Sequence, residues 1–437
     1  MLVFMIFITS NINTTGSPMQ KIKHEPVASL PHQTNLYYTE NGDTLYVGGN
    51  GPGNYTNIQN AINNAKDGDT IFVFGGHYPA EIVVDKSLNI IGEDRDNTII
   101  RGGQDGFYIY ADNVKISNFT IRECDSFWNN AAIHLESNDN IITHNKIVDN
   151  GKLNALFMKD SDNNIISDNF IENNPYHAIR MEYSNYNNIT RNYIHDNEGD
   201  GLFLVESSNN YFELNTISSS FWGGITIDEY SENNIFIHNN LINNSQNAND
   251  NGHNIWNSSY PSGGNYWSDY NGIDQFQGPY QDIPGSDGIG DTPYDLPCEH
   301  AVDWYPLMNP STFPYAPVIT GKTNGKIGME YNYNFFVDDL DNDDLFLRVN
   351  WGNGNLSKWY GPYSSGTDVE LTHIWNKGGT YQIKAQVKDT NELEGKWGTL
   401  QVTIPRYTCL SFEPNNNLFE YLSSNLMKIL IFLTIIF

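Results

Sequence analysis

Apolar and polar residues alternate in short segments that return along the middle of the chain at a nearly constant interval. Ile133, Leu156, Ile179, Leu202 and Ile225 follow one another at steps of 23 residues, and another apolar residue stands two places after each. Alternation with a period of two is typical of β-strands, whose successive side chains point to opposite faces. A small residue, alanine or glycine, directly precedes each member of this column. The pattern predicts short parallel strands stacked in register, with the apolar columns inside.

Asparagine marks the same repeat in two further columns, which recur at steps of 23 to 27 residues. The first column is Asn113, Asn140, Asn164, Asn187, Asn210 and Asn234, and the second is Asn118, Asn145, Asn169, Asn192, Asn215 and Asn239. Asparagine tolerates left-handed backbone and bonds to nearby amides, so we expect it at turns, where aligned copies can form a hydrogen-bonded ladder. A repeat of about 23 residues cannot hold a strand and a crossover helix. The fold class is therefore all-β, a parallel β-helix.

Five segments are predicted along the chain. They are a signal-like segment and polar lead-in (1–32), the β-helix with an N-terminal capping helix (33–257), a C-terminal segment of the β-helix region (258–312), a β-sandwich (313–405), and a linker with an apolar tail (406–437). The first eight residues are apolar and polar residues follow, as after the apolar stretch of a secretory signal. The 12 residues of 426–437 are too few to span a membrane, so we expect them to contact a membrane or the cell envelope.

Net charge narrows the class of partner, and the cysteines exclude two kinds of site. The chain carries 52 acidic and 23 basic residues, a net charge of −29, which argues against nucleic acid or an anionic membrane as a partner. It fits an extracellular surface or one that gathers cations. Cys124, Cys298 and Cys409 are far apart in sequence and form neither a disulfide framework nor a thiolate metal motif. The signal-like N-terminus and the acidic charge together predict a secreted or cell-surface protein.

Several motifs in residues 40–310 resemble those of the NosD-type right-handed β-helix proteins. The motifs are DGDTIFVFGGHYPAEIVVDKSLNIIGE, the N-N-I-x-x-N-x-I coils, GGNYWSDYNGID, DGIGDTPYDLP and DWYPLMNP. These proteins belong to the pectin-lyase-like group of carbohydrate-binding and sugar-hydrolase β-helices. The resemblance implies a right-handed solenoid and a glycan partner. The NosD namesake implies accessory work in copper-centre maturation, although the histidines and methionines of this chain are scattered.

The region after Phe313 has a different character. Alternating strands and glycine-rich turns at this spacing predict a β-sandwich. Its WGNG turn and its GTYQIKAQVKD strand resemble a PKD-type immunoglobulin-like domain. The resemblance implies a spacer or an adhesion module without chemistry of its own.

The outward-facing columns of the solenoid are the candidate ligand site. Two columns run in register, His134, Phe157, Arg180, Phe203 and Thr226, and then Glu136, Lys159, Glu182, Val205 and Asp228. A linear polysaccharide or cell-envelope glycan can lie along such columns. We expect the two phenylalanine rings to be exposed and to stack on sugars, and Arg180 to pair with acidic sugars. The predicted substrate-binding residues are His134, Phe157, Arg180, Phe203 and Asp228.

Two carboxylates in these columns are candidate catalytic residues. Glu136 and Glu182 lie two coils apart, about 9.6 Å at the backbone, and their side chains can approach the separation used by inverting glycosidases. The alternative is that they are ordinary solvated charges, since Lys159 lies between them. His177 and Asp200, one coil apart, can form a hydrogen bond that either serves chemistry or satisfies the turn.

Two acidic loops are candidate calcium sites. Carboxylate oxygens are the ligands that Ca²⁺ prefers, and neither loop has EF-hand spacing. The expected ligands are Asp282, Asp287 and Asp291 in the first loop and Asp339, Asp341 and Asp343 in the second.

Three functions fit these patterns. The first is carbohydrate binding or surface adhesion, and the second is a polysaccharide lyase or glycoside hydrolase that works along the groove. The third is a copper-accessory role of the NosD kind.

Overall fold

The computed structural model describes residues 42–125, 129–152, 154–298, 300–339, 344–390 and 394–405. The predicted signal-like segment and apolar tail lie outside these residues. The chain divides into two compact units, Met1–Ser311 and Thr312–Phe437. Among the described residues, no helix is long and apolar enough to cross a membrane.

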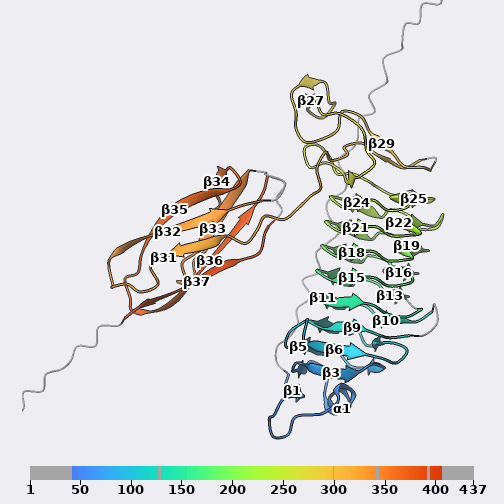
Figure 1. The fold of residues 1–437 in the computed structure, drawn as a ribbon, viewed down its shortest axis with the longest axis horizontal. Helices are drawn as coiled ribbons and strands as arrows, with labels where there is room; N and C mark the ends of the chain where they lie inside the picture. Colours follow the sequence, from blue (N-terminus) through green and yellow to red (C-terminus); the bar gives the residue numbers. More distant parts are fainter. Residues whose placement is uncertain are drawn as a thin grey trace, which may run out of the picture. The chain divides into compact units, whose positions relative to one another are not determined.

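The first unit is a parallel β-helix built from three sheets (Figure 1). The first sheet contains β1 (Thr44–Val47), β2 (Thr70–Val73), β5 (Asn89–Gly92), β8 (Lys115–Ser117), β11 (Ile141–Thr143), β14 (Ile165–Ser167), β17 (Asn188–Thr190), β20 (Tyr211–Glu213) and β23 (Ile235–Ile237). The second contains β3 (Gly76–Pro79), β6 (Thr98–Arg101), β9 (Thr120–Arg122), β12 (Lys146–Val148), β15 (Phe170–Glu172), β18 (Tyr193–His195), β21 (Thr216–Ser218), β24 (Asn240–Ile242) and β26 (Tyr266–Trp267). The third contains β4 (Ile82–Val84), β7 (Phe107–Ile109), β10 (Ala131–Leu135), β13 (Asn154–Lys159), β16 (Ile179–Glu182), β19 (Asp200–Val205), β22 (Gly223–Ile227) and β25 (Ala248–Asp250).

The predicted apolar columns form the core of this solenoid. Ile133, Leu156, Ile179 and Leu202 pair in register along the third sheet, and none of them has exposed surface. At Gly201 the packing leaves no room for a side chain, because a Cβ there would lie 2.4 Å from the side chain of Ile217. The predicted parallel β-helix is confirmed.

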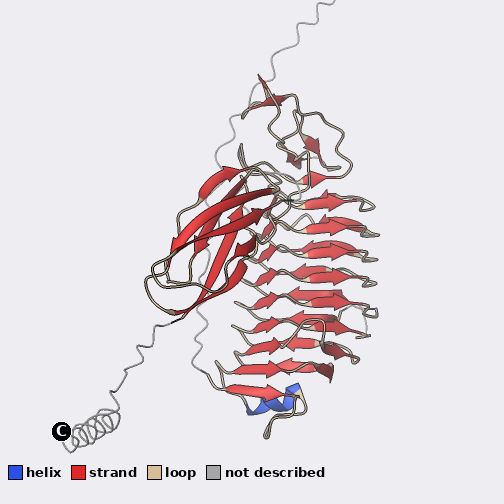
Figure 2. Ribbon diagram, turned by 60° about the vertical axis from the view of Figure 1, so that its left-hand side comes forward, coloured by secondary structure: helices blue, strands red, loops and turns tan. Residues whose placement is uncertain are grey.

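The helix α1 (Ile58–Asn64) covers one end of the stack of strands (Figure 2). It buries Ile58, Ala61 and Ile62, which join the hydrophobic core of the solenoid. Asn57 caps the helix, since its side chain accepts a backbone N–H of the first turn at 3.2 Å. The first coil therefore does not expose its apolar interior to water.

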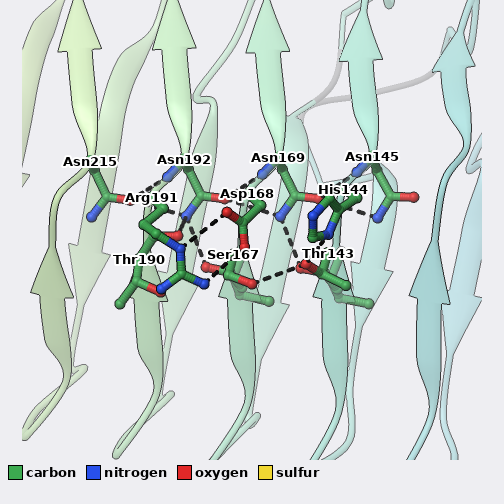
Figure 3. Close-up of polar contacts among 12 residues, drawn as sticks. Thr143, His144, Asn145, Ser167, Asp168, Asn169, Thr190, Arg191, Asn192 and Asn215 are labelled. Atoms are coloured by element: carbon green, nitrogen blue, oxygen red, sulfur yellow. Dashed lines mark hydrogen bonds and ion pairs between the residues drawn. The ribbon is translucent and has the colours of Figure 1, made fainter. Parts of the chain in front are cut away.

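Asparagine ladders run along the solenoid, as predicted. Figure 3 shows Asn145, Asn169, Asn192 and Asn215 in a row, one from each coil. Asn169 Nδ2 donates to Asn192 Oδ1 at 3.0 Å, and Asn192 Nδ2 donates to Asn215 Oδ1 at 3.0 Å. Each Oδ1 also accepts the backbone N–H of the preceding asparagine, as from Asn169 to Asn192 at 3.1 Å. These side chains are almost completely buried, and the ladder satisfies the amide groups of turns that water does not reach.

The left-handed backbone lies one residue earlier than expected. Asp168 and Arg191, which precede ladder asparagines, have φ of 57° and 56°. In the first copy, Asn118 is itself left-handed, with φ of 64°, and Phe119 occupies the ladder position. The N–H of Phe119 donates to Asn145 Oδ1 across a step of 26 residues. The prediction that aligned Asn118 with Asn145 is therefore wrong by one residue, and the same holds for the first copy of the other column.

Each of the two predicted ladders ends at its own buried aspartate, which also accepts an indole N–H. Asn265 continues the second ladder, and its backbone N–H donates to Asp303 Oδ2 at 2.7 Å. The same oxygen accepts Trp267 Nε1–H at 2.9 Å. At the end of the other ladder, Asp250 accepts the side chain of Asn254 and the indole N–H of Trp256. The NYW and DWYP motifs therefore close the second ladder at the C-terminal end of the solenoid.

Two short antiparallel pairs complete the first unit, β27 (Phe276–Gln277) with β28 (Ile283–Pro284), and β29 (Tyr294–Asp295) with β30 (Val302–Asp303).

The second unit is a β-sandwich of two antiparallel sheets. One sheet contains β31 (Val318–Gly321), β32 (Glu330–Val337) and β35 (Thr367–Ile374), and the other contains β33 (Leu345–Asn350), β34 (Tyr360–Tyr363), β36 (Gly379–Lys388) and β37 (Gly398–Ile404). Its core includes Tyr333, Phe335 and Trp375. The predicted β-sandwich is confirmed.

Candidate functional site

The predicted outward column lies on the outer face of the third sheet, with the register that the sequence indicates. His134, Phe157, Arg180, Phe203 and Thr226 are paired neighbours from β10 to β22.

The exposure expected for this column is wrong for three of its members. Phe157 is only 3% exposed, and His134 and Arg180 are also buried. The His134 ring centroid lies 4.9 Å from that of Phe157, and the Arg180 guanidinium carbon lies 4.9 Å from the Phe157 centroid on its other side in the column. In-register strands about 4.8 Å apart place like side chains on top of one another. The two faces of the Phe157 ring are therefore covered by protein, and the half-buried members of the column are Phe203 and Thr226.

We expected Arg180 to pair with an acidic sugar, but its guanidinium already has a carboxylate partner. Its Nη2 forms a short ion pair with Glu182 Oε1, and both side chains are largely buried. A guanidinium paired with a carboxylate offers little net charge to a ligand. The structure therefore removes the physical reason for expecting acidic glycans at this position.

The two candidate catalytic carboxylates occupy the predicted coils but have protein partners. Lys159 pairs in register with Glu182, and Glu136 Oε1 lies 3.5 Å from His134 Nε2. Burial lowers the pKa of His134 to about 4, so this ring is neutral at pH 7. Catalysis by Glu136 and Glu182 stays a prediction.

His177, two residues before β16, is in contact with Asp200, the first residue of β19. His177 Nδ1 lies 3.2 Å from Asp200 Oδ2 and accepts the backbone N–H of Asp200 at 3.2 Å. A neutral ring therefore carries its proton on Nε2. Thr226 Oγ1 donates to Asp200 Oδ1 at 3.0 Å, which holds the carboxylate in place.

Exposed aromatic side chains gather beside His177, at the turns between the second and third sheets. We call Tyr176, His177, Phe203, Phe221 and Trp222 the aromatic rim. The His177 ring stacks on Phe203 with centroids 4.5 Å apart, and Trp222 meets His177 and Tyr176 edge-on at 5.3 and 5.2 Å. Phe221 and Trp222 are 73% and 49% exposed. The exposed aromatic surface expected along the sheet thus lies at its edge.

A pocket of about 390 Å³ adjoins the aromatic rim. It is lined by Pro175, Asp196, Asn197, Glu198, Ser219, Phe221 and Trp222. Apolar rings therefore form one part of its wall, and carboxylates, an amide and a hydroxyl form the rest. The sequence signal for this site was the Phe-Trp pair in the otherwise polar turn SSSFWGG, which interrupts the repeat pattern.

The remaining predicted ligands take part in turns. Asp228 accepts the backbone N–H groups of Glu206 and Tyr230 and the hydroxyl of Ser231. Asp287 accepts backbone N–H groups of Gly278 and Ile289.

In the first acidic loop, Asp291 accepts the backbone N–H groups of Gln275 and Phe276, and Asp282 is exposed. In the second loop, Asp339 is buried and accepts Thr312 Oγ1, whereas Asp341 and Asp343 lie outside the described residues. Calcium at either loop stays a prediction.

One group of potential metal ligands occurs within the described part of the chain. Glu172, His195 and Asp196 each offer one ligand atom, and these atoms lie within 4.8 Å of one another. Reasoning from the sequence missed this group, because Glu172 and His195 lie 23 residues apart, in separate coils, and form no short motif.

The solenoid of the first unit contains the region that matches a known family. Residues 62–272 match the NosD family, whose members are described as periplasmic copper-binding proteins. The NosD match covers most of the solenoid, from α1 to the segment after β26. Among curated proteins, none matches this chain.

Solved structures with similar folds include pectate lyase Pel9A, with 12% identity over 54% of this chain and 83% of that chain and a TM-score of 0.33. The A-module of mannuronan C-5 epimerase AlgE4 from Azotobacter vinelandii has 10% identity over 48% and 88% of the two chains and a TM-score of 0.26. The PKD domain of an M14-like peptidase from a Thermoplasmatales archaeon is similar to the second unit at 45% identity, over 21% of this chain and 96% of that chain, with a TM-score of 0.21.

The NosD match raises the question of copper. Met158 and Met181 are neighbours in the core and have no exposed surface. Cys124 is buried, and burial, with the nearby Asp105 and Glu123 carboxylates, raises the pKa of its thiol to about 12. These sulfurs do not fit Cu(I), which needs accessible thiolate or thioether ligands. The nitrogen and oxygen donors of Glu172, His195 and Asp196 fit a divalent ion instead.

Proposed function

We propose that the protein binds a polysaccharide at the aromatic rim and the adjoining pocket. The observation that carries this proposal is the exposure of Phe221 and Trp222 beside a pocket with polar walls. Large exposed aromatic side chains are typical of contact surfaces. A sugar ring has an apolar face that can stack on an aromatic ring and hydroxyl groups that can bond to the carboxylates of Asp196 and Glu198.

The chemistry of the pocket favours neutral sugars. Asp196 and Glu198 line it, and within the pocket lining no cationic side chain offsets them. The chain has a net charge of −29, so an anionic polymer is also repelled at long range. Neutral polysaccharides, whose hydroxyl groups donate to carboxylates, are therefore the expected ligand class.

A role outside the cell or at its surface follows from this proposal. Polysaccharide chains of this kind are met in cell envelopes and in the medium. The second unit, a β-sandwich similar to a PKD domain, supports adhesion as the setting.

Affinity electrophoresis of the full chain, in EDTA, through gels that contain one polysaccharide each tests this function. We expect retardation by a neutral glucan or mannan and none by polygalacturonate or alginate. Retardation by the acidic polymers alone would contradict the proposal, and so would the absence of retardation in every gel.

A further inference from the structure

We propose that Glu172, His195 and Asp196 form a binding site for a divalent transition-metal ion, of the class of Zn²⁺ or Cu²⁺. The three residues lie where β15 and β18 end in the second sheet, and Glu172 pairs in register with His195. The proposal does not depend on glycan binding.

The distances are close to those of a metal site. The three ligand atoms lie within 4.8 Å of one another, and His195 Nε2 is 2.9 Å from Asp196 Oδ2. Ligand atoms of a tetrahedral Zn²⁺ lie about 3.5 Å apart, given metal–ligand distances of about 2.1 Å. A side-chain movement on the order of 1 Å therefore brings all three atoms onto one ion.

The two ring nitrogens of His195 have different neighbours, Ser218 at Nδ1 and Asp196 at Nε2. His195 Nδ1 lies 2.8 Å from Ser218 Oγ, and the Ser218 hydroxyl is 3.5 Å from the carbonyl oxygen of Ile194, to which it can donate. When Nε2 binds a metal ion, the ring proton is on Nδ1 and Ser218 Oγ can accept it. A hydrogen bond of this kind to the nitrogen that does not bind the metal orients metal-binding histidines.

His195 Nε2 and Asp196 Oδ2 lie 2.9 Å apart, so a bound metal ion would take the place of the proton that these two atoms share in its absence. Glu172 adds a second carboxylate to the same group. One imidazole and two carboxylates would therefore surround a divalent ion.

The ligand types select the class of ion. One imidazole and two carboxylates suit Zn²⁺ and Cu²⁺, whereas Ca²⁺ takes oxygen ligands only and usually six or more of them. At a given nitrogen and oxygen site, Cu²⁺ binds more tightly than Zn²⁺. Three protein ligands leave a coordination position open, and Asp196 also lines the pocket, so the ion would lie at the pocket wall.

Calorimetric titration of the full chain with ZnCl₂ and CuCl₂, after EDTA and desalting, tests the site. We expect His195→Gln to reduce the number of bound ions by one, and Ser218→Ala to weaken binding by about 10-fold to 100-fold. The matched control is His77→Gln, which changes an exposed histidine on β3 of the same sheet and should leave binding unchanged.

Electron paramagnetic resonance of the Cu²⁺ complex gives a second readout. We expect coupling to a single nitrogen at the first equivalent of Cu²⁺, lost in His195→Gln and kept in His77→Gln. If His195→Gln fails to fold, Glu172→Gln and Asp196→Asn replace it, each with a weaker affinity expected. Unchanged stoichiometry, affinity and spectrum in the folded variants would overturn the proposal, and so would a wild-type chain that binds neither ion.

Discussion

A single asparagine of the ladder forms hydrogen bonds with several neighbouring residues. Asn192 Nδ2 donates to Asn215 Oδ1 and to the carbonyl oxygen of Ile166, while its Oδ1 accepts two N–H groups of Asn169. In a buried position each of these groups costs free energy if its partner is removed. The asparagine repeat therefore has a structural cause, and it is not evidence for ligand binding.

Replacement of Asn192 by alanine should be strongly destabilising. It leaves the N–H groups of Asn169 and the carbonyl of Ile166 without partners, so we expect the free energy of unfolding to fall by at least about 3 kcal/mol. The matched control is Asn188→Ala, in the same coil but half-buried on the outer side of β17, with an expected effect below about 0.5 kcal/mol. Denaturant unfolding measures both, and equal effects would contradict the role of the ladder.

At the scale of elements, the strands at the C-terminal end of the solenoid are joined through one buried carboxylate, that of Asp303. Asp303 has no exposed surface and accepts the N–H groups of Asn265, Trp267 and Tyr305. Burial raises the pKa of Asp303 to about 7, although these hydrogen bonds oppose the shift. The closure should therefore respond to pH.

The direction of this response follows from linkage. Between pH 4 and 7 the folded chain holds a proton on Asp303 that the unfolded chain has released, so stability falls as pH rises through this range. We expect the melting temperature of the wild type, relative to that of Asp303→Asn, to decrease from pH 4 to pH 7. A constant difference across this range would show that Asp303 is ionised throughout.

The sequence repeat made the strands of the solenoid predictable, but it did not predict the aromatic rim. Spacing alone identified the inward column of Ile179 and Leu202, because burial selects apolar residues in every coil. Spacing could not show that Phe157 is covered, since that depends on what its neighbours His134 and Arg180 do with their side chains. Phe221 and Trp222 stand in a turn outside the repeat, where no periodicity applies.

At the scale of the whole molecule, the solenoid provides a rigid support on which a few turn residues form a contact surface. Its three sheets are held by the core and the ladders, and the turns between the second and third sheets carry the exposed rings. A shared fold does not by itself fix function, so the NosD match leaves the ligand to be found from the site.

Calorimetry of two rim variants tests the central claim most directly. With a neutral polysaccharide that retards the wild type, we expect Phe221→Ala and Trp222→Ala each to weaken binding by about 10-fold, from the loss of about 1–2 kcal/mol of aromatic contact. The control is Tyr230→Ala, which removes a ring that is 64% exposed at the turn between the third and first sheets. The account predicts unchanged affinity for this control, with all variants melting like the wild type. Wild-type affinity in both rim variants would contradict it.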